Sequence, residues 1–436
     1  MIELLKELIL DAQKGSIEVG FTRNLKVWPV TKKATVIVGV RRCGKSTYLS
    51  QIVNHLLNDG VKKENILFIN FFDDRLAPLK TSGLDKVTEA YFLLYPEKKG
   101  NEKIYCFFDE IQIAAEWESF IDRLLRTENC EIYLSGSSAR LLSKEIGTQM
   151  RGRAISWEMF PFSFGEYLQS QGFSYTLPVN TAERIQIQKS FEDYFNRGGF
   201  PETMGLEDFL RVKIHQEYFG SILFRDLIER YDVSHPKALT DLARKLLDNI
   251  ASLYTLNNLT NSLQSLGHKA PKNTIAQFLE WFEDAYFLFT VRMYSTSFNK
   301  SNVNPKKIYC IDHAFVRSLT SGILVNSGHY LENVVFMALR RVYPEIFYYK
   351  TEAGQEIDFL ILDTKRQFNL VQVAFSLEQP TTRQRELIGL QNAMKELQVE
   401  NSTIVTWSES ETIQAEDSKI EIIPAWRFLL QLEQTN

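Results

Sequence analysis

Eight residues decide the fold of this chain, and they read Gly39-Val40-Arg41-Arg42-Cys43-Gly44-Lys45-Ser46. A glycine, four further residues and then Gly-Lys-Ser form the Walker A pattern of a phosphate-binding loop. The apolar run TVIV before it predicts a strand, and TYLSQIVNHLL after it predicts a helix. Because this order separates a phosphate-binding loop from a chance match, we expect the chain to bind a nucleotide here.

The loop predicts a role for each of its residues. Lys45 would add its charge to the β- and γ-phosphates, and Ser46 would bind Mg²⁺ with its hydroxyl, with Thr47 as the alternative. Arg41 and Arg42 would contact either phosphate or a neighbouring domain. The backbone N–H groups would surround the phosphate oxygens, at the positive end of the helix dipole. The predicted nucleotide-binding residues are Gly39, Val40, Arg41, Arg42, Cys43, Gly44, Lys45, Ser46 and Thr47.

A second motif supplies the acids that hydrolysis requires. The apolar run IYCFF ends in Asp109 and Glu110, which is the Walker B pattern of a buried strand followed by carboxylates. Asp109 would hold Mg²⁺ directly or through water, and Glu110 would orient and deprotonate the attacking water. The alternative is an ordinary solvated turn. After a Walker A motif, the pair instead predicts a hydrolytic site.

The next strand-like run ends in serines that could sense the γ-phosphate. In the additional-strand class of P-loop ATPases, which this order of motifs resembles, that strand lies between the Walker A and Walker B strands. We choose Ser137 as the sensor, with Ser135 and Ser138 as alternatives. The non-functional alternative is a plain Ser/Gly loop.

Arginines follow this run, and a cation on the transferring phosphoryl group speeds hydrolysis. Arg151 and Arg153 are better candidates than Arg140. They would act within one chain or across an oligomer, or they are surface arginines that bond to carboxylates.

The bulk composition is that of a multidomain protein that folds throughout. The 436 residues carry a net charge of −4, so there is no global basic surface for nucleic acid, although a local patch remains open. The chain begins with an amphipathic helix pattern and has no signal peptide or run of about 18 apolar residues, so we expect a cytoplasmic protein without a membrane span. Its four cysteines are scattered, which indicates reduced thiols and no zinc site.

Three regions follow from the pattern along the chain. Residues 1–204 alternate apolar runs with helical stretches, which predicts an α/β P-loop core with a parallel sheet. Residues 205–298 are helical with a winged-helix-like order, in which FLFTVRMYS would be the wing strand. Residues 299–436 return to an α/β pattern and predict a separate domain with its own sheet.

Several motifs together resemble a broad group of bacterial and archaeal AAA-type ATPases, and the likeness extends over the whole chain. They are RRCGKS, FFDEIQ, SGSSARLLS, RGR, PFSFGEYL and RGGFPE. The resemblance implies ATP and Mg²⁺ as cofactors, a winged-helix region, and a C-terminal α/β domain similar to PD-(D/E)XK restriction endonucleases. It also implies an ATP-driven switch or motor, sometimes compared with the signalling STAND ATPases.

The nuclease-like site matches its pattern only in part. Glu332 fits the helix acid and Asp358 the strand acid, whereas Gln372 and Ala374 replace the second acid and the lysine. Without the lysine no group polarises the attacking water, so we expect a non-cleaving domain in which Glu332, Asp358 and Gln372 form at most a weak metal site. Lys350 and Lys365 are conceivable substitutes for the missing lysine.

The target of the ATP cycle stays open at this stage. Lys269 and Lys272 begin the last helix of the winged-helix region, where DNA readers make contacts, but Glu280, Glu283 and Asp284 follow. The region would bind DNA or pack as a lid on the ATPase core. Our leading hypothesis is a switch or motor acting on nucleic acid; the alternatives are a slow signalling or scaffold ATPase that recruits a protein partner, and an ATP-gated nuclease.

Overall fold

The structure is a computed structural model, and it describes residues 1–137, 150, 152–295, 297, 304–320, 326–363, 365–415 and 418–434. Contacts divide the chain into two units. The first comprises Met1–Phe160 with Asp284–Tyr286, and the second comprises Pro161–Glu283 with Phe287–Asn436. The predicted Ser138, Arg140 and Arg151 lie outside the described residues.

The first unit is built on a five-stranded sheet in which every neighbouring pair is parallel. The strand order is β2-β3-β4-β1-β5, so the strand before the Walker A loop and the Walker B strand flank β4, as predicted. The strands form because continuous apolar runs can be buried on both faces of a sheet. Their bounds are β1 (Ala34–Val38), β2 (Ile66–Asn70), β3 (Ile104–Asp109), β4 (Cys130–Gly136) and β5 (Ala154–Glu158).

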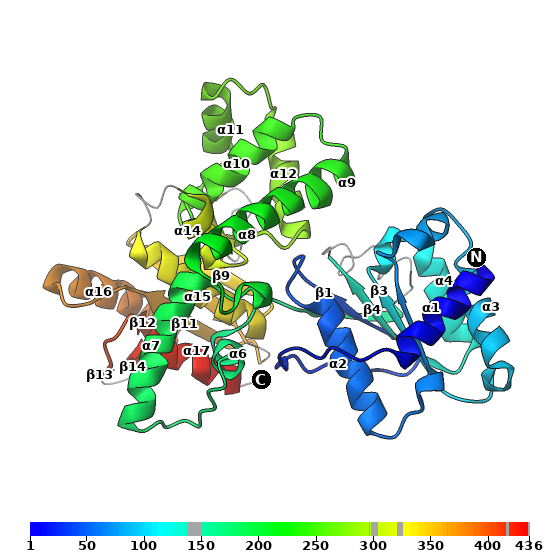
Figure 1. The fold of residues 1–436 in the computed structure, drawn as a ribbon. Coiled ribbons are helices and arrows are strands. Elements are labelled where there is room, and N and C mark those ends of the chain that lie inside the picture. Colours follow the sequence, from blue (N-terminus) through cyan, green and yellow to red (C-terminus); the bar gives the residue numbers. More distant parts are fainter. Residues whose placement is uncertain are drawn as a thin grey trace. The chain divides into compact units, whose positions relative to one another are not determined.

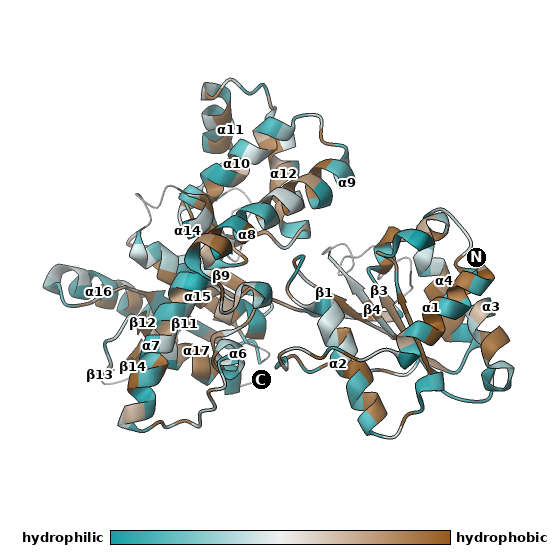
Figure 2. Ribbon diagram, viewed as in Figure 1, coloured by the Kyte–Doolittle hydropathy of each residue, from teal (hydrophilic) through white to brown (hydrophobic). Residues whose placement is uncertain are grey.

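Helices cover this sheet, and the central strands lie between α2 and α4 (Figure 1). Figure 2 shows mixed hydropathy on these helices, as expected for elements with one face on a core. The predicted N-terminal helix is α1, which buries Leu5 and Ile9. The helices are α1 (Ile2–Lys14), α2 (Lys45–Asn58), α3 (Asp85–Leu94) and α4 (Trp117–Thr127), with short 3-10 turns at η1 (Lys63–Asn65), η2 (Asp74–Lys80), η3 (Pro96–Lys98) and η4 (Ile111–Ile113).

The second unit contains a mixed sheet of nine strands within the described residues. Its order is β13-β14-β12-β11-β10-β9-β7-β8-β6. The bounds are β6 (Leu253–Tyr254), β7 (Leu288–Met293), β8 (Lys306–Cys310), β9 (Ile346–Lys350), β10 (Glu356–Leu362), β11 (Phe368–Val373), β12 (Asn401–Thr406), β13 (Glu411–Ala415) and β14 (Ser418–Pro424).

Some helices of the second unit precede its first sheet strand, and others alternate with the later strands. One of them, α8, runs into a π-helical segment, η7 (Ile222–Ile228), before α9. The bounds are α6 (Phe164–Ser170), α7 (Thr181–Arg197), η6 (Pro201–Thr203), α8 (Asp208–Ser221), α9 (Glu229–Tyr231), α10 (Pro236–Asp248), α11 (Leu256–Ser265), α12 (Lys272–Asp284), α14 (His313–Leu319), α15 (Ser327–Val342), α16 (Pro380–Leu397) and α17 (Ala425–Gln434).

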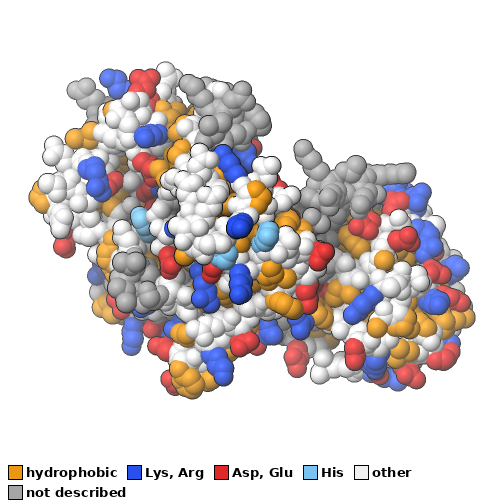
Figure 3. Space-filling view, turned by 90° about the horizontal axis from the view of Figure 1, so that it is seen from above, with side chains coloured by type: hydrophobic (Ala, Val, Ile, Leu, Met, Phe, Trp, Pro, Cys, Tyr) orange, Lys and Arg blue, Asp and Glu red, His pale blue; other side chains and the backbone are white. Residues whose placement is uncertain are grey.

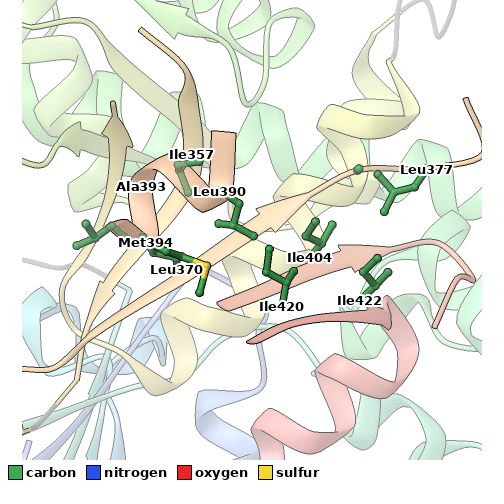
Figure 4. Packing of buried hydrophobic residues seen from close by; sticks show 11 residues of the cluster. Ile357, Leu370, Leu377, Leu390, Ala393, Met394, Ile404, Ile420 and Ile422 are labelled. Carbon is green, nitrogen blue, oxygen red and sulfur yellow. The ribbon is translucent and has the colours of Figure 1, made fainter. Parts of the chain in front are cut away.

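An apolar core holds α16 against the sheet of the second unit (Figure 4). Leu390 and Met394 of α16 face Ile357 of β10, Leu370 of β11 and Ile404 of β12. Leu390 is fully buried, so Leu390→Ala would remove about 2–5 kcal/mol of stability through lost burial and the cavity left behind.

The run predicted as a wing strand belongs to the large sheet. It forms β7, which pairs antiparallel with β8 and parallel with β9. Strands from both sides of the predicted boundary at residue 298 therefore share one sheet, because sheet hydrogen bonds join segments distant in sequence. The division into 1–204, 205–298 and 299–436 differs from the contact-based division and stays a prediction.

The structure also bears on membrane insertion. Among the described residues, no helix combines the length and the apolar character that crossing a bilayer requires.

Candidate functional site

The phosphate-binding loop has the backbone geometry that its glycines predict. Gly44 precedes α2 with φ +100°, in the left-handed region that glycine adopts at little cost. A side chain at Gly39 would overlap the carbonyl oxygen of Met159, which follows β5. Both glycines are therefore required by the loop's shape.

Lys45 lies inside the loop and is 4% exposed. Its Nζ donates to the carbonyl oxygens of Gly39, at 3.1 Å, and Val40, at 3.0 Å. These acceptors carry no net charge, so an incoming phosphate would be a stronger partner for the ammonium.

The Walker B acid meets the predicted magnesium serine at the carboxyl ends of the strands. Asp109 is 1% exposed, and burial raises the pKa of its carboxyl, while hydrogen bonds from Ser135 and Ser46 act against that rise. A carboxylate and a serine hydroxyl are oxygen donors that suit Mg²⁺ together with phosphate oxygens and water. The two predicted ligands thus lie together, and among the described residues no three His, Cys, Asp or Glu side chains are arranged to hold a metal ion by themselves.

Glu110 is held in a fixed orientation beside Asp109. Its backbone N–H donates to Ser135 Oγ at 3.0 Å, and its Oε2 accepts from Gln112 Nε2 at 2.5 Å. Glu110 also adopts φ +53°, an uncommon conformation for a residue other than glycine that clusters at functional sites. Glu110 as a whole is 7% exposed, so it is shielded from bulk water.

Among the candidate sensor serines, Ser135 contacts both acids. Its hydroxyl donates to Asp109 Oδ1 and accepts from the N–H of Glu110. Ser137 is buried, and its Oγ has no hydrogen-bond partner within the described residues. Ser135 lies within β4 and Ser137 follows the end of that strand, and Ser135 is the one that reaches Asp109. The sensing role of Ser137 stays a prediction.

Arg153 lies in an ion pair in this structure. Its Nη1 contacts Asp122 Oδ1 of α4 at 2.9 Å, and Asp122 also pairs with Arg126 at 2.8 Å. The predicted action of Arg153 on the γ-phosphate would require this pair to open, and it stays a prediction.

Sequence reasoning missed Arg23, which supports the loop from behind. Its Nη1 donates to the carbonyl of Cys43 at 2.7 Å and its Nη2 to that of Phe160 at 2.6 Å. The segment around it also contacts α2, since Gln51 donates to the carbonyl of Phe21 at 2.7 Å. A single arginine in a polar stretch gives no signal of this role.

The second unit brings the three predicted nuclease-like residues together. Glu332 of α15 and Asp358 of β10 are both within 2.9 Å of one ammonium, Lys307 Nζ, and the amide of Gln372 accepts from the N–H of Asp358 at 3.1 Å. The predicted lysine substitutes, Lys350 and Lys365, are both exposed.

A β-bulge orients Asp358. The register of β10 shifts between Ile357 and Leu360, so both of these face the α16 core although strict alternation would separate them. Phe359 instead stacks on Phe336 of α15, on the side where Asp358 approaches Glu332.

The electrostatics of this cluster are strong. Burial, and then the charge of Asp358, raise the pKa of Glu332, while the ammonium of Lys307 acts against that rise. Desolvation alone would lower the pKa of Lys307, but the surrounding carboxylates raise it well above its ordinary value. Lys307 therefore stays charged in the folded protein.

The winged-helix residues are divided between surface and interior. Lys269 and Lys272 are exposed. Glu283 turns inward, accepts from the N–H of Thr290 at 2.8 Å, and has a pKa raised by burial. Of the acids predicted to repel phosphate, this one has its carboxylate held by a neighbouring residue.

Comparison with known families assigns the first unit. Residues 31–168 match the AAA domain, residues 188–323 match a domain of unknown function, DUF8612, and residues 327–428 match another, DUF4143. The AAA domain includes both Walker motifs. The matches to the second unit carry no described activity.

Two full-length relatives are known only as uncharacterized proteins. One, from Methanocaldococcus jannaschii, is 32% identical over 441 residues, with 98% of this chain and 95% of the relative covered. The other, from Haemophilus influenzae, is 29% identical over 401 residues, with 91% and 94% covered.

Solved structures show weaker likeness. A Walker-type ATPase of Pyrococcus abyssi is 17% identical with a TM-score of 0.41, covering 66% of this chain and 90% of that one. The Aeropyrum pernix Orc1 protein in complex with DNA is 11% identical with a TM-score of 0.29, covering 74% and 92%. Scores this low add nothing to the family match.

Proposed function

The chain belongs to the same family as the uncharacterized Methanocaldococcus jannaschii protein and carries an AAA-type ATPase domain, and on this premise we propose that it hydrolyses ATP with Mg²⁺. One observation carries the proposal. Ser135 ties Asp109 and Glu110 into a single unit next to Ser46 and the Lys45 loop.

In the proposed mechanism, Lys45 moves its hydrogen bonds from the carbonyls of Gly39 and Val40 to the β- and γ-phosphates. Mg²⁺ held by Ser46 and Asp109 would neutralise the phosphate charge that grows as the terminal P–O bond breaks. Arg23 keeps the loop backbone in place through the carbonyl of Cys43.

Glu110 is the proposed group that takes the proton of the attacking water. Gln112 holds Oε2, which leaves Oε1 to accept the proton as the water oxygen bonds to the γ-phosphorus and ADP leaves. Burial of the carboxylate keeps competing water away, which strengthens its interaction with the nucleophile.

The test is Glu110→Gln, which keeps the shape and removes the base. We expect hydrolysis to fall about 100-fold or more while ATP affinity stays within about threefold, because glutamine cannot accept the proton. Glu116→Gln, at an exposed acid of the same unit, is the matched control and should hydrolyse ATP normally. Full turnover in Glu110→Gln would rule out the assigned base.

The finer proposal is that the cycle drives a conformational switch, with nucleic acid as its target. Lys269 and Lys272 supply exposed cations at the start of α12. On the face drawn in Figure 3, however, Lys and Arg side chains alternate with Asp and Glu. Binding would therefore be local. ATPase rates that are unchanged by DNA and RNA at several salt concentrations would exclude the nucleic-acid target.

A second candidate function is a slow signalling or scaffold ATPase that waits for a protein partner. The ion pair of Arg153 with Asp122 favours it, because an arginine held there is not on the phosphoryl group. This candidate predicts co-purified nucleotide and a near-zero basal rate. Asp122→Asn, which frees Arg153, would then raise the basal rate of hydrolysis. A rapid basal rate in the parent protein would exclude this candidate function.

A further inference from the structure

One buried ammonium fills the centre of the nuclease-like cluster. Lys307 Nζ lies 2.9 Å from Glu332 Oε1, 2.8 Å from Glu356 Oε1 and 2.8 Å from Asp358 Oδ1. The side chain is 2% exposed. An ammonium has three N–H donors, and each has a carboxylate oxygen here.

Three elements contribute to this cluster, and the sheet topology brings them together. Lys307 lies on β8, Glu332 on α15, and Glu356 and Asp358 on β10. β8 and β10 are not neighbours in the sheet, but β7 pairs with β8 in its first part and with β9 at Arg292 and Met293. β9 in turn pairs with β10, so this connection joins β8 to the strand that carries Glu356 and Asp358.

Further donors reach both of the deeply buried acids. Tyr309 donates its hydroxyl to Glu332 Oε1 at 2.6 Å, and the N–H of Val373 donates to Asp358 Oδ2 at 2.9 Å. Gln372 Oε1 accepts from the N–H of Asp358, and its Nε2 donates to Glu386 at 2.8 Å. These hydrogen bonds hold the cluster in addition to the three contacts of Lys307.

A divalent cation would compete directly with this lysine. Mg²⁺ and Mn²⁺ need about six oxygen ligands at close to 2.1 Å, and Glu332 and Asp358 are the acids that would supply them. The ammonium of Lys307 occupies the space between these acids. It would repel a second cation placed beside it, because charges this close together in a buried site are only weakly screened.

We propose that Lys307 is the built-in cation of this cluster and replaces a divalent metal, so that the second unit retains the acids of a nuclease-like site as a structural lock. The lock joins β8, α15 and β10 without metal. Removing the ammonium while keeping the acids would convert the lock into a divalent-cation site.

The test uses the full chain, freed of nucleotide and metal, titrated with MnCl₂ by calorimetry and by electron paramagnetic resonance of free Mn²⁺. The proteins are the parent, Lys307→Met, Asp358→Asn, and the double variant Lys307→Met/Asp358→Asn. Since the ATP site is the same in all four, differences between them report on the cluster.

We expect Lys307→Met to bind one more Mn²⁺ per chain than the parent. The double variant should lose that ion. Parent and Asp358→Asn should bind equally, and neither should cleave plasmid DNA with Mn²⁺.

Two results would overturn the proposal. One is a parent Mn²⁺ ion, or plasmid cleavage, that disappears in Asp358→Asn, because Lys307 would then act beside a metal. The other is a folded Lys307→Met protein that binds no additional Mn²⁺. If circular dichroism shows that Lys307→Met does not fold, the parent and Asp358→Asn comparison decides by itself.

Discussion

Two buried lysines stand beside acids in the two units, and their partners differ in charge. Lys45 donates to the uncharged carbonyls of Gly39 and Val40, whereas Lys307 is surrounded by three carboxylates. The first ammonium can exchange its partners for phosphate, and the second cannot improve on the partners it has. The residue type therefore does not decide between a binding site and a structural lock; the charge of the neighbours does.

The acids repeat this contrast. Asp109 is held by the hydroxyls of Ser135 and Ser46, which are neutral donors that can share the carboxylate with a metal. Asp358 is held by an ammonium and a backbone N–H. Neutral donors leave the charge of a carboxylate uncompensated, so Asp109 retains its attraction for a cation.

The largest effect is expected at the first lysine. Lys45→Met should lower kcat/KM for ATP about 1,000-fold or more, because it removes the charge that the phosphates meet during transfer. Steady-state hydrolysis measures this, with Lys62→Met, at an exposed lysine of the same unit, as the control. In the part of the chain that the structure describes, Lys45 donates to the neutral carbonyls of Gly39 and Val40, so the midpoint of thermal unfolding should change little. A large drop would show that Lys45 has a structural role like that of Lys307.

At the second lysine, Lys307, we expect a large effect on stability. Lys307→Met should lower the free energy of unfolding by about 3–5 kcal/mol, because it leaves buried carboxylates without their cation. Urea unfolding followed by circular dichroism measures it, and Lys350→Met, at an exposed lysine, should stay within about 0.5 kcal/mol of the parent. If the free energy of unfolding is unchanged, Lys307 does not act as a structural lock.

A third buried group that gains a proton as a cation is His215, whose hydrogen-bond partner is a hydroxyl. His215 is fully buried, its Nδ1 meets Ser318 Oγ at 2.8 Å, and burial lowers its pKa to about 4. The stability linked to its neutral form is present above the unfolded pKa of about 6.5 and is lost as pH falls from there to about 4, an effect of about 3 kcal/mol.

The measurement is urea unfolding of the parent and of His215→Gln between pH 7 and pH 4. The variant lacks the titrating group, so its stability should fall less steeply across this window. Parallel pH curves for the two proteins would contradict the assigned shift.

The smallest effect is expected at the serine that joins the two acids. Ser135→Ala removes one donor to Asp109 and one acceptor from Glu110, so hydrolysis should fall about tenfold, in line with two hydrogen bonds of about 0.5–1 kcal/mol each. Ser82→Ala, at an exposed serine, is the control. If Ser137→Ala alone lowers the rate, then Ser137 is the serine that matters for hydrolysis.

Much of the fold was predictable because its signals are local. The apolar runs that became β1, β3 and β4 are continuous, and a run that is buried on both faces needs no partner to be recognised. The winged-helix prediction is unconfirmed, because it depends on which strands pair with β7. The sequence of that run is the same whether it pairs as a wing or enters a larger sheet.

By itself, the sequence determined the phosphate-binding loop and the Walker B acids, because glycine geometry and the strand–loop–helix order are encoded in neighbouring residues. Only the tertiary structure showed that Arg23 supports the loop, that Ser135 joins the acids, and that Lys307 takes the cation position between Glu332 and Asp358. These contacts join residues 20 to 137 positions apart in the chain. Contacts between residues this far apart in the chain depend on which elements pack together, and the sequence of one segment does not identify the segment that it contacts.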